Sequence, residues 1–297
     1  MAEIWPNFFI AGAAKAGTTS LYSYLKQHPQ VFLPKIKEPQ YFASVKPAPE
    51  YAHLVDAVTD RGRYLKLFRG AERYAAIGDA SPSYLWDPEA PNRIKRTVPH
   101  ARIIISLRDP VERAFSHYLM DYREGAQDLP FYEAICEDVA RKKKGIGVSF
   151  LYVEFGQYHA QVRRYLNTFG PDNVEILMFE QLRRATREVI ARIVRFLGLD
   201  AAPVDQIDTS RVHNGYAVPR ARWARWLAGA HWTRTLGQTV VPRSLAAFIY
   251  EQFLLKSGRK PEIDPRAKEL LCEIYQPEIR QLEQVLGYPL PELRRSW

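Results

Sequence analysis

The stretch that decides the fold lies near the start of the chain: Asn7-Phe8-Phe9-Ile10-Ala11-Gly12-Ala13-Ala14-Lys15-Ala16-Gly17-Thr18-Thr19. Residues 7–11 form an apolar run, which is typical of a strand buried on both faces of a parallel sheet. Residues 12–19 are mostly small and predict a loop. A helix is expected to follow as far as about Gln27, because apolar side chains recur at helical spacing until Pro29 stops the pattern.

Outward from this unit, predicted strands and helices alternate. The strands are predicted over 74–78, 101–107 and 174–179. The helices are predicted from Asp87-Pro88, from Asp109-Pro110 to Tyr122, and over 181–197 ahead of Gly198. This alternation implies right-handed βαβ units. The sequence therefore predicts an α/β protein with a P-loop-like three-layer fold, in which helices flank a central parallel sheet.

The last hundred residues follow a different pattern. Residues 200–220 are loop-like, and after them three helices are predicted, over 223–228, 244–255 and 264–286. No linker, internal repeat or low-complexity segment separates this part from the rest. We therefore expect a single domain over 1–297, with an α/β core at about 7–200 and a helical C-terminal portion at about 220–297 packed on it.

Composition limits the class of protein. The chain has 297 residues, 46% hydrophobic and 25% charged, which excludes a disordered, collagen-like or disulfide-scaffold protein. Its two cysteines, Cys136 and Cys272, are expected to be buried free thiols of a reducing compartment, without a cysteine-based zinc site. No run approaches the roughly 20 apolar residues of a transmembrane helix, so we expect a cytoplasmic protein without a transmembrane segment.

The net charge of +9 favours acidic partners, but the basic residues are scattered along the sequence. The densest run is Arg141-Lys142-Lys143-Lys144. Because cations are stable at a helix C-terminus, we interpret this run as a solvated helix end; contact with an anionic acceptor is the alternative. The sequence contains no recognised RNA- or DNA-binding motif, so a nucleic-acid partner is not expected.

The loop at 12–19 has the composition of a phosphate-binding site. Small residues let backbone N–H groups converge on an anion, and the N-terminus of the next helix adds partial positive charge. The spacing is similar to G-x-x-x-x-G-K-[ST], but Thr18 stands where that motif has its lysine, and Lys15 lies in mid-loop. The arrangement that a nucleoside triphosphate and its metal require is therefore missing.

Two other segments carry candidate chemistry. Glu38 lies between a lysine and a proline, and a partly desolvated pocket there would raise its pKa and suit it to general-base work; a solvated loop carboxylate is the alternative. Arg108 ends a predicted strand at the sheet edge where ligands bind, and Ser116 lies two helical turns further on. An arginine and a hydroxyl together suit a phosphate monoester, whereas a surface ion-pair network such as Arg108–Asp109 is the alternative.

Taken together, these segments resemble the sulfotransferases that use 3′-phosphoadenosine 5′-phosphosulfate (PAPS). Residues 14–21 resemble their 5′-phosphosulfate loop, and residues 107–118 resemble their 3′-phosphate segment. Residues 37–42, Lys-Glu-Pro-Gln-Tyr-Phe, are similar to the Lys-Glu-Pro-x-Phe-Phe segment of the heparan-sulfate-type branch. Residues 78–85 also resemble this branch, with Asp79 in place of its usual glutamate.

Two later segments, Gly156-Gln157-Tyr158 and Phe179-Glu180-Gln181-Leu182, match the same branch, so the resemblance covers about 7–200. The chain therefore resembles a bacterial-like, single-domain member of the heparan-sulfate-type branch. The cytosolic aryl and steroid sulfotransferases have a histidine base and a C-terminal Lys-Gly-x-x-Gly loop, and this sequence has neither.

The resemblance implies transfer of a sulfuryl group from PAPS to an acceptor hydroxyl or amine without a metal. Glu38 is the implied general base, and Lys15 is the implied stabiliser of the leaving phosphate. The implied nucleotide-binding residues are Lys15, Ala16, Gly17, Thr18, Thr19, Ser20, Arg108 and Ser116, together with Arg211 and Arg220 from a later loop.

The acceptor is left open by the sequence. The branch favours carbohydrates, and small-molecule, lipid and peptide acceptors are the alternatives. Candidate stacking platforms for sugar rings, with core packing as the other interpretation, are Trp223, Trp226, Trp232, Tyr41 and Tyr84. Two other functions are weighed: a P-loop kinase, which would need magnesium and ATP, and a basic nucleic-acid-binding protein. The sequence does not indicate an oligomeric state.

Overall fold

A computed structural model of the chain describes residues 3–44, 57–123, 125–141, 150–210 and 260–297, together with two strands at 217–219 and 255–257. Its centre is a five-stranded parallel sheet in the order β2-β3-β1-β4-β5. The strands are β1 (Phe8–Gly12), β2 (Val31–Phe32), β3 (Ala76–Ala80), β4 (Arg102–Leu107) and β5 (Val174–Met178). The predicted central parallel sheet is therefore confirmed, and β3 lies two residues later than expected.

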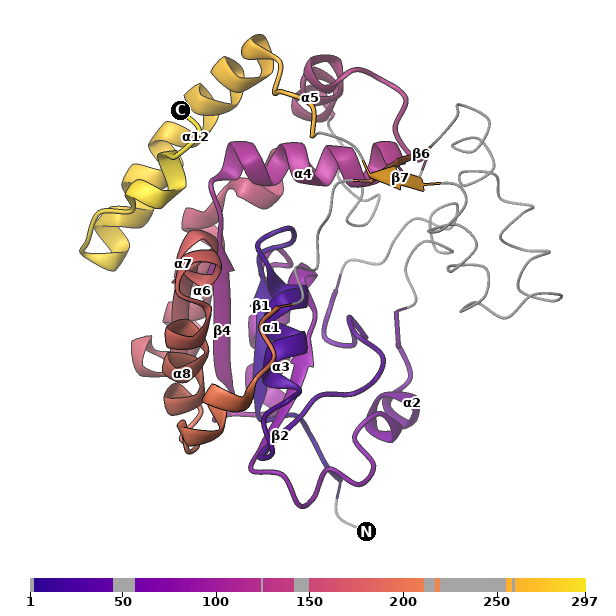
Figure 1. The fold of residues 1–297 in the computed structure, drawn as a ribbon, viewed down its shortest axis with the longest axis vertical. Coiled ribbons are helices and arrows are strands. Elements are labelled where there is room, and N and C mark those ends of the chain that lie inside the picture. Colours follow the sequence, from indigo (N-terminus) through magenta and orange to yellow (C-terminus); the bar gives the residue numbers. More distant parts are fainter. Residues whose placement is uncertain are drawn as a thin grey trace, which may run out of the picture.

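Helices cover both faces of this sheet, as Figure 1 shows. Successive side chains of β1 point to opposite faces, so that Phe8 and Ile10 enter one apolar cluster while Phe9 and Ala11 enter the other. The first cluster includes buried side chains of α1 (Thr18–Leu25) and α8 (Thr186–Phe196); the second includes those of α3 (Ala90–Thr97), α4 (Pro110–Arg123) and α6 (Tyr158–Phe169). The predicted three-layer fold is confirmed.

The remaining elements connect these layers or lie outside them. The other helices are α2 (Arg61–Lys66), α5 (Phe131–Ala140), α7 (Phe179–Arg184) and α12 (Pro265–Leu286), with 3-10 turns η2 (Pro82–Tyr84), η3 (Glu154–Gly156), η4 (Pro171–Asn173), η5 (Ala202–Gln206) and η7 (Pro291–Arg294). Two short strands, β6 (Ala217–Pro219) and β7 (Leu255–Ser257), pair antiparallel. Within the described ranges, no helix has the length and apolar character needed to cross a bilayer.

The helical C-terminal portion packs on the core through α12, which lies along the outside of the molecule in Figure 1. Its buried face includes Leu271, Tyr275, Ile279 and Leu282 at helical spacing. The Tyr275 hydroxyl donates to the backbone oxygen of Val153 at 3.0 Å. The predicted helix at 264–286 is thus confirmed. The helix predicted over 223–228 lies outside the described residues, as does most of the one over 244–255, and Leu255 itself belongs to a strand.

Two local predictions are wrong. The single helix expected over 181–197 is divided into α7 and α8, because Ala185 leaves the helical region with φ −132° and ψ 51°. Cys136 and Cys272 are free, but both are partly exposed instead of buried. Helices α5 and α6 were not predicted from the sequence, although their buried residues recur at helical spacing, as Tyr158, Val162, Tyr165 and Phe169 do in α6.

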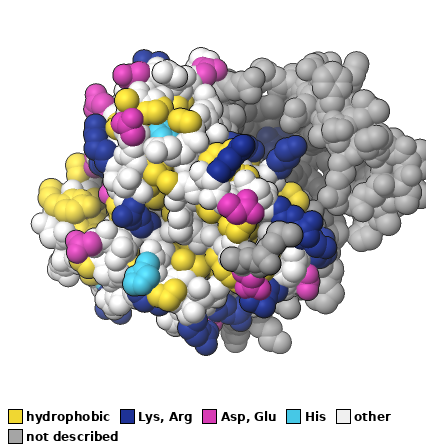
Figure 2. Space-filling model, turned by 90° about the horizontal axis from the view of Figure 1, so that it is seen from below, with side chains coloured by type: hydrophobic (Ala, Val, Ile, Leu, Met, Phe, Trp, Pro, Cys, Tyr) yellow, Lys and Arg dark blue, Asp and Glu magenta, His cyan; other side chains and the backbone are white. Residues whose placement is uncertain are grey.

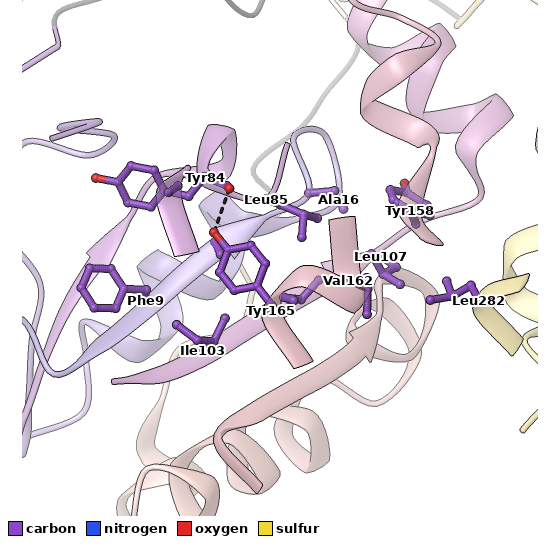
Figure 3. Packing of buried hydrophobic residues seen from close by; sticks show 14 of the residues in the cluster. Phe9, Ala16, Tyr84, Leu85, Ile103, Leu107, Tyr158, Val162, Tyr165 and Leu282 are labelled. Carbon is purple, nitrogen blue, oxygen red and sulfur yellow. Dashed lines mark hydrogen bonds between the residues drawn. The ribbon is translucent and has the colours of Figure 1, made fainter. Parts of the chain in front are cut away.

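Closely packed residues hold the carboxyl end of β1, and Figure 3 draws some of them. Tyr165 of α6 donates its hydroxyl proton to the backbone oxygen of Tyr84 at 2.8 Å. The amide of Leu85 donates to the oxygen of Ala11 at 2.7 Å. A Cβ added at Gly12 would lie 2.4 Å from the Cβ of Leu85, so only glycine allows this approach.

We expect Gly78→Ala to destabilise the protein by about 1–3 kcal/mol, because a Cβ there would lie 2.2 Å from Cζ of Phe8 in the neighbouring strand. Urea unfolding followed by circular dichroism measures the change. The double variant Phe8→Leu/Gly78→Ala makes room for the new methyl group, so its loss should be smaller than the sum of the two single losses. Strict additivity would contradict the steric explanation.

Candidate active site

The loop after β1 is fixed to the neighbouring strand β4 by backbone and hydroxyl contacts. The amide of Ala13 donates to the oxygen of Ser106 at 2.7 Å, and the Ser106 hydroxyl donates to the oxygen of Ala16 at 2.6 Å. Gly17 then begins α1 with φ 83°, and no side chain caps the helix. A Cβ at Gly17 would lie 2.8 Å from the Phe179 ring. The first N–H groups of α1 are therefore presented by a rigid loop in which small residues are required.

Lys15 lies at the middle of this loop with φ 67°. Its Nζ lies 3.5 Å from Sδ of Met120 on α4, and its backbone oxygen accepts a hydrogen bond from Nη1 of Arg108 at 3.2 Å. The lysine side chain therefore crosses to α4, while its backbone is tied to the arginine at the end of β4. The structure thus brings the two predicted cations, Lys15 and Arg108, to one edge of the sheet.

Arg108 is held on several sides. Its guanidinium lies 4.7 Å from the centre of the Phe179 ring, and its Nη2 is 2.9 Å from Oε2 of Glu112. Its side chain is 13% exposed, and its Nε is buried without a hydrogen-bond partner among the described residues. Tyr158, from the matched Gly156-Gln157-Tyr158 segment, donates to the Arg108 backbone oxygen at 2.9 Å. In the alternative interpretation Arg108 would pair with Asp109 at the surface, whereas the structure pairs it with Glu112.

Ser116 lies on the face of α4 that meets the loop. Residues 112, 116 and 120 are four apart and share one face of the helix. Glu112 contacts Arg108 and Met120 contacts Lys15, so the half-buried Ser116 lies on that face between them. The spacing that suggested Ser116 from the sequence is therefore compatible with a ligand contacting both cations.

Lys260 is a further candidate site residue, which was not predicted from the sequence. Its Nζ lies 5.1 Å from the centre of the Phe115 ring, on the same helix as Glu112. Desolvation, followed by the nearby charge of Arg108, lowers the pKa of Lys260, and the charge of Glu112 opposes this. The signal in the sequence was a short basic cluster: Lys256, Arg259 and Lys260. Arg211 and Arg220, which the sequence analysis placed at the nucleotide, lie outside the described residues.

Glu38 lies at the carboxyl edge of the same sheet. Its amide donates to the oxygen of Ala80, the last residue of β3, at 3.0 Å, and Ala80 is paired with Ile10 of β1. The side chain is 42% exposed and forms an ion pair with Lys37. Of the two interpretations of Glu38, the exposed side chain agrees with a solvated loop carboxylate and not with a desolvated pocket.

Asp79, beneath Glu38, is completely buried. Burial raises its pKa to about 6, hydrogen bonds from hydroxyl groups partly offset this, and the charge of Glu38 raises it slightly further. One of these donors is Tyr84, which is itself fully buried, so the prediction that Tyr84 stacks on a sugar is wrong. Tyr41 is half-buried and stacks on Tyr64 with 4.2 Å between the ring centres. The tryptophans of that prediction lie outside the described residues.

Basic and acidic side chains are interspersed on the molecular face drawn in Figure 2. Of the run at 141–144, only Arg141 is described; it follows the end of α5 and pairs with Glu137 at 3.1 Å. The helix end predicted there is confirmed. Groups of three or more His, Cys, Asp or Glu side chains arranged to hold a metal ion are not found in the part of the chain that the structure describes.

Comparisons with known proteins agree with this architecture. A sulfotransferase from Alicyclobacillus acidocaldarius has a crystal structure that is similar over 98% of this chain and 100% of that chain, with a TM-score of 0.74 and 29% identity. The mouse sulfotransferase SULT7A1, solved with 3′-phosphoadenosine 5′-phosphate (PAP), shares the fold with a TM-score of 0.52 at 15% identity. The similarity covers 92% of this chain and 84% of that one.

Among relatives by sequence, the human bifunctional heparan sulfate N-deacetylase/N-sulfotransferase 3 is 27% identical over 98% of this chain and 31% of that protein. Human carbohydrate sulfotransferase 15 is 32% identical over 44% of this chain and 30% of that protein. The chain thus spans about a third or less of the length of these relatives. The model of the Sulfotransferase family matches residues 6–203, so this chain belongs to the Sulfotransferase family.

Proposed function

We propose that the protein transfers a sulfuryl group from PAPS to a hydroxyl or amine of a carbohydrate-containing acceptor. One observation carries the proposal: the rigid loop at 13–17, the uncapped start of α1 and Arg108 converge at one edge of the sheet. Such a convergence of N–H groups and cations suits a ligand with two separate phosphate groups. The names of the heparan sulfate and carbohydrate relatives support the acceptor class.

In this proposal the 5′-phosphosulfate lies on Lys15 and on the backbone of Ala16, Gly17, Thr18, Thr19 and Ser20. The 3′-phosphate lies against Arg108 and Ser116, and Lys260 adds a third positive group. The unpartnered Nε of Arg108 supports this assignment, because a buried donor without an acceptor is costly unless a ligand supplies one. Arg211 and Arg220 are retained as proposed nucleotide contacts from the later loop.

The proposed reaction forms a bond between the acceptor oxygen or nitrogen and sulfur, and breaks the bond between sulfur and the bridging oxygen of the 5′-phosphate. Glu38 takes the acceptor's proton, and 3′-phosphoadenosine 5′-phosphate (PAP) leaves. Sulfuryl transfer resembles phosphoryl transfer in its loose transition state, with charge growing on the leaving oxygen. Lys15 and the N–H groups of α1 are suited to stabilise that charge.

In this segment Glu38 forms an ion pair with Lys37 at the edge of the sheet. Tyr41, which follows in the same segment, is half-buried, so part of its ring can contact a sugar in this proposal. We also propose that residues 1–297 form one sulfotransferase domain. The packing of α12 on α4, α5 and α6 supports this proposal.

Calorimetric titration without magnesium tests the nucleotide assignment. We expect PAP to bind roughly 10–100-fold more tightly than ADP, because charged hydrogen bonds to a 3′-phosphate contribute about 1.5–3 kcal/mol. Arg108→Ala should remove most of that preference, whereas Arg63→Ala, at an exposed position of α2, should retain it. Equal binding of PAP and ADP by the wild type, or a requirement for magnesium and a triphosphate, would favour the kinase alternative.

Lys15→Ala should lower kcat by roughly 10²–10³-fold, because it removes a preorganised donor from the leaving oxygen. Rapid-quench or coupled assays with PAPS and a heparan-type oligosaccharide measure this loss. Lys26→Ala is the matched control, since Lys26 lies at the other end of α1 and contacts Tyr22. A near-normal kcat for Lys15→Ala would show that this role is wrong.

Glu38→Gln should lower kcat by roughly 10²–10⁴-fold while the Kd for PAP stays within about twofold, because a general base acts on the acceptor and not on the nucleotide. The exposed Glu72→Gln serves as the control. If Glu38→Gln instead weakened PAP binding and left kcat unchanged, the residue would have a structural role at the nucleotide site.

A further inference from the structure

We propose that Asp79 is a positioning residue, whose buried carboxylate orients the hydroxyls of Ser81 and Tyr84 so that they hold the backbone carrying Glu38. This inference rests on the proposed function, because it assumes that Glu38 is the general base. It concerns how the base is held in place, and it assigns a role to a residue that contacts neither nucleotide nor acceptor in the proposed arrangement.

Asp79 lies in β3 with no exposed surface, and three hydroxyl groups surround its carboxylate. The hydroxyl of Tyr64 donates to it at 2.7 Å, that of Ser81 at 2.8 Å and that of Tyr84 at 2.9 Å. No ion pair joins Asp79 to a cation within the described ranges. A buried carboxylate is costly, so such a network is retained only where its hydrogen bonds are well satisfied.

Two of these hydroxyls have a second contact, with the Glu38 segment. The amide of Gln40 donates to Oγ of Ser81 at 3.1 Å, and the amide of Phe42 donates to the Tyr84 hydroxyl oxygen at 3.2 Å. A hydroxyl has one proton and accepts with its lone pairs. Because a carboxylate only accepts, it takes both protons and leaves both oxygens to the two amides. Asp79 thereby fixes the direction of two hydrogen-bond relays, one from the Gln40 amide through Ser81 and one from the Phe42 amide through Tyr84.

The segment held in this way has an unfavourable backbone. Glu38 has φ 62° and Gln40 has φ 54°, a left-handed conformation that is unfavourable for a residue other than glycine. A third contact, from the Glu38 amide to the Ala80 oxygen at 3.0 Å, ties the segment to the end of the same strand. The conformation persists because these contacts, two of them oriented by Asp79, act on alternate residues of the segment.

Tyr64 provides the internal comparison. Its hydroxyl also donates to Asp79, but its second contact is the stacking of its ring on Tyr41, not a hydrogen bond to the backbone of the Glu38 segment. Removing the Tyr64 hydroxyl therefore removes one donor from Asp79 and leaves both relays in place. A role in stability alone would make the three hydroxyls equivalent, whereas a positioning role separates Ser81 and Tyr84 from Tyr64.

Ionisation of Asp79 offers a further readout. The groups that face it are the hydroxyls of Tyr64 on α2, Tyr84 on η2 and Ser81, and the charge of Glu38 at a greater distance. Burial raises the pKa of Asp79 to about 6, so the carboxylate form is lost as the pH falls through that value. A protonated carboxyl donates one hydrogen bond itself, so the three hydroxyls are no longer all held as donors to it and the direction of the two relays is no longer fixed.

The experiment compares Asp79→Asn, Ser81→Ala and Tyr84→Phe with the control Tyr64→Phe. We expect each of the first three to lower kcat about 10–100-fold, because displacing a catalytic group by about 1 Å costs on the order of 10²-fold. The KM for PAPS and the Kd for PAP should stay within about twofold. Tyr64→Phe should keep kcat within about threefold, even if its melting temperature falls.

Wild-type kcat should also decline as the pH falls through about 6, and Asp79→Asn should lack this decline. Normal kcat in Asp79→Asn, or equal losses in Tyr64→Phe and Tyr84→Phe, would overturn the positioning role. If Asp79→Asn does not fold, Ser81→Ala alone decides the question, since it deletes one relay at an unchanged carboxylate. A near-normal Glu38→Gln would instead refute the base assignment, whatever Asp79→Asn does.

Discussion

The structure depends on one close backbone contact, where the loop after β1 lies against the end of β4. Ser106 uses both its carbonyl and its hydroxyl for that contact, accepting from Ala13 and donating to Ala16. The methyl groups of Ala13 and Ala16 are buried at this contact, which agrees with the small residues that dominate the loop. This contact fixes the start of α1 and the backbone of Lys15, and hence the place at which N–H groups converge.

Electrostatic balance at the site is local and does not follow from the net charge of +9. Arg108 is balanced by Glu112 and stacked on Phe179, and Lys37 is balanced by Glu38. A stacked guanidinium keeps its orientation with little loss of rotamer freedom, so its donors are ready for a planar or tetrahedral anion. The cations that matter to the proposed reaction are therefore oriented before any ligand arrives.

The Glu38 segment is held by a polar network instead of an apolar one. Asp79, Ser81 and Tyr84 are all buried, yet each hydrogen bond in the network has a defined direction. An apolar floor would hold the segment without fixing its backbone dihedrals. Directional contacts can hold the left-handed conformations of Glu38 and Gln40, and this explains why polar groups occupy the core there.

The sequence by itself determined most strands of the central sheet, the small-residue loop after the first strand, and the motifs around Glu38 and Arg108. Each of these depends on residues that are close together in the chain. Apolar periodicity specifies a buried strand, and small residues specify a tight loop. Only the tertiary structure decided the break at Ala185, the burial of Tyr84, the exposure of Glu38 and the approach of Lys260 to Arg108. These features depend on which distant segments pack together. The local pattern of apolar and polar residues does not indicate which residue some 150 positions away becomes a neighbour.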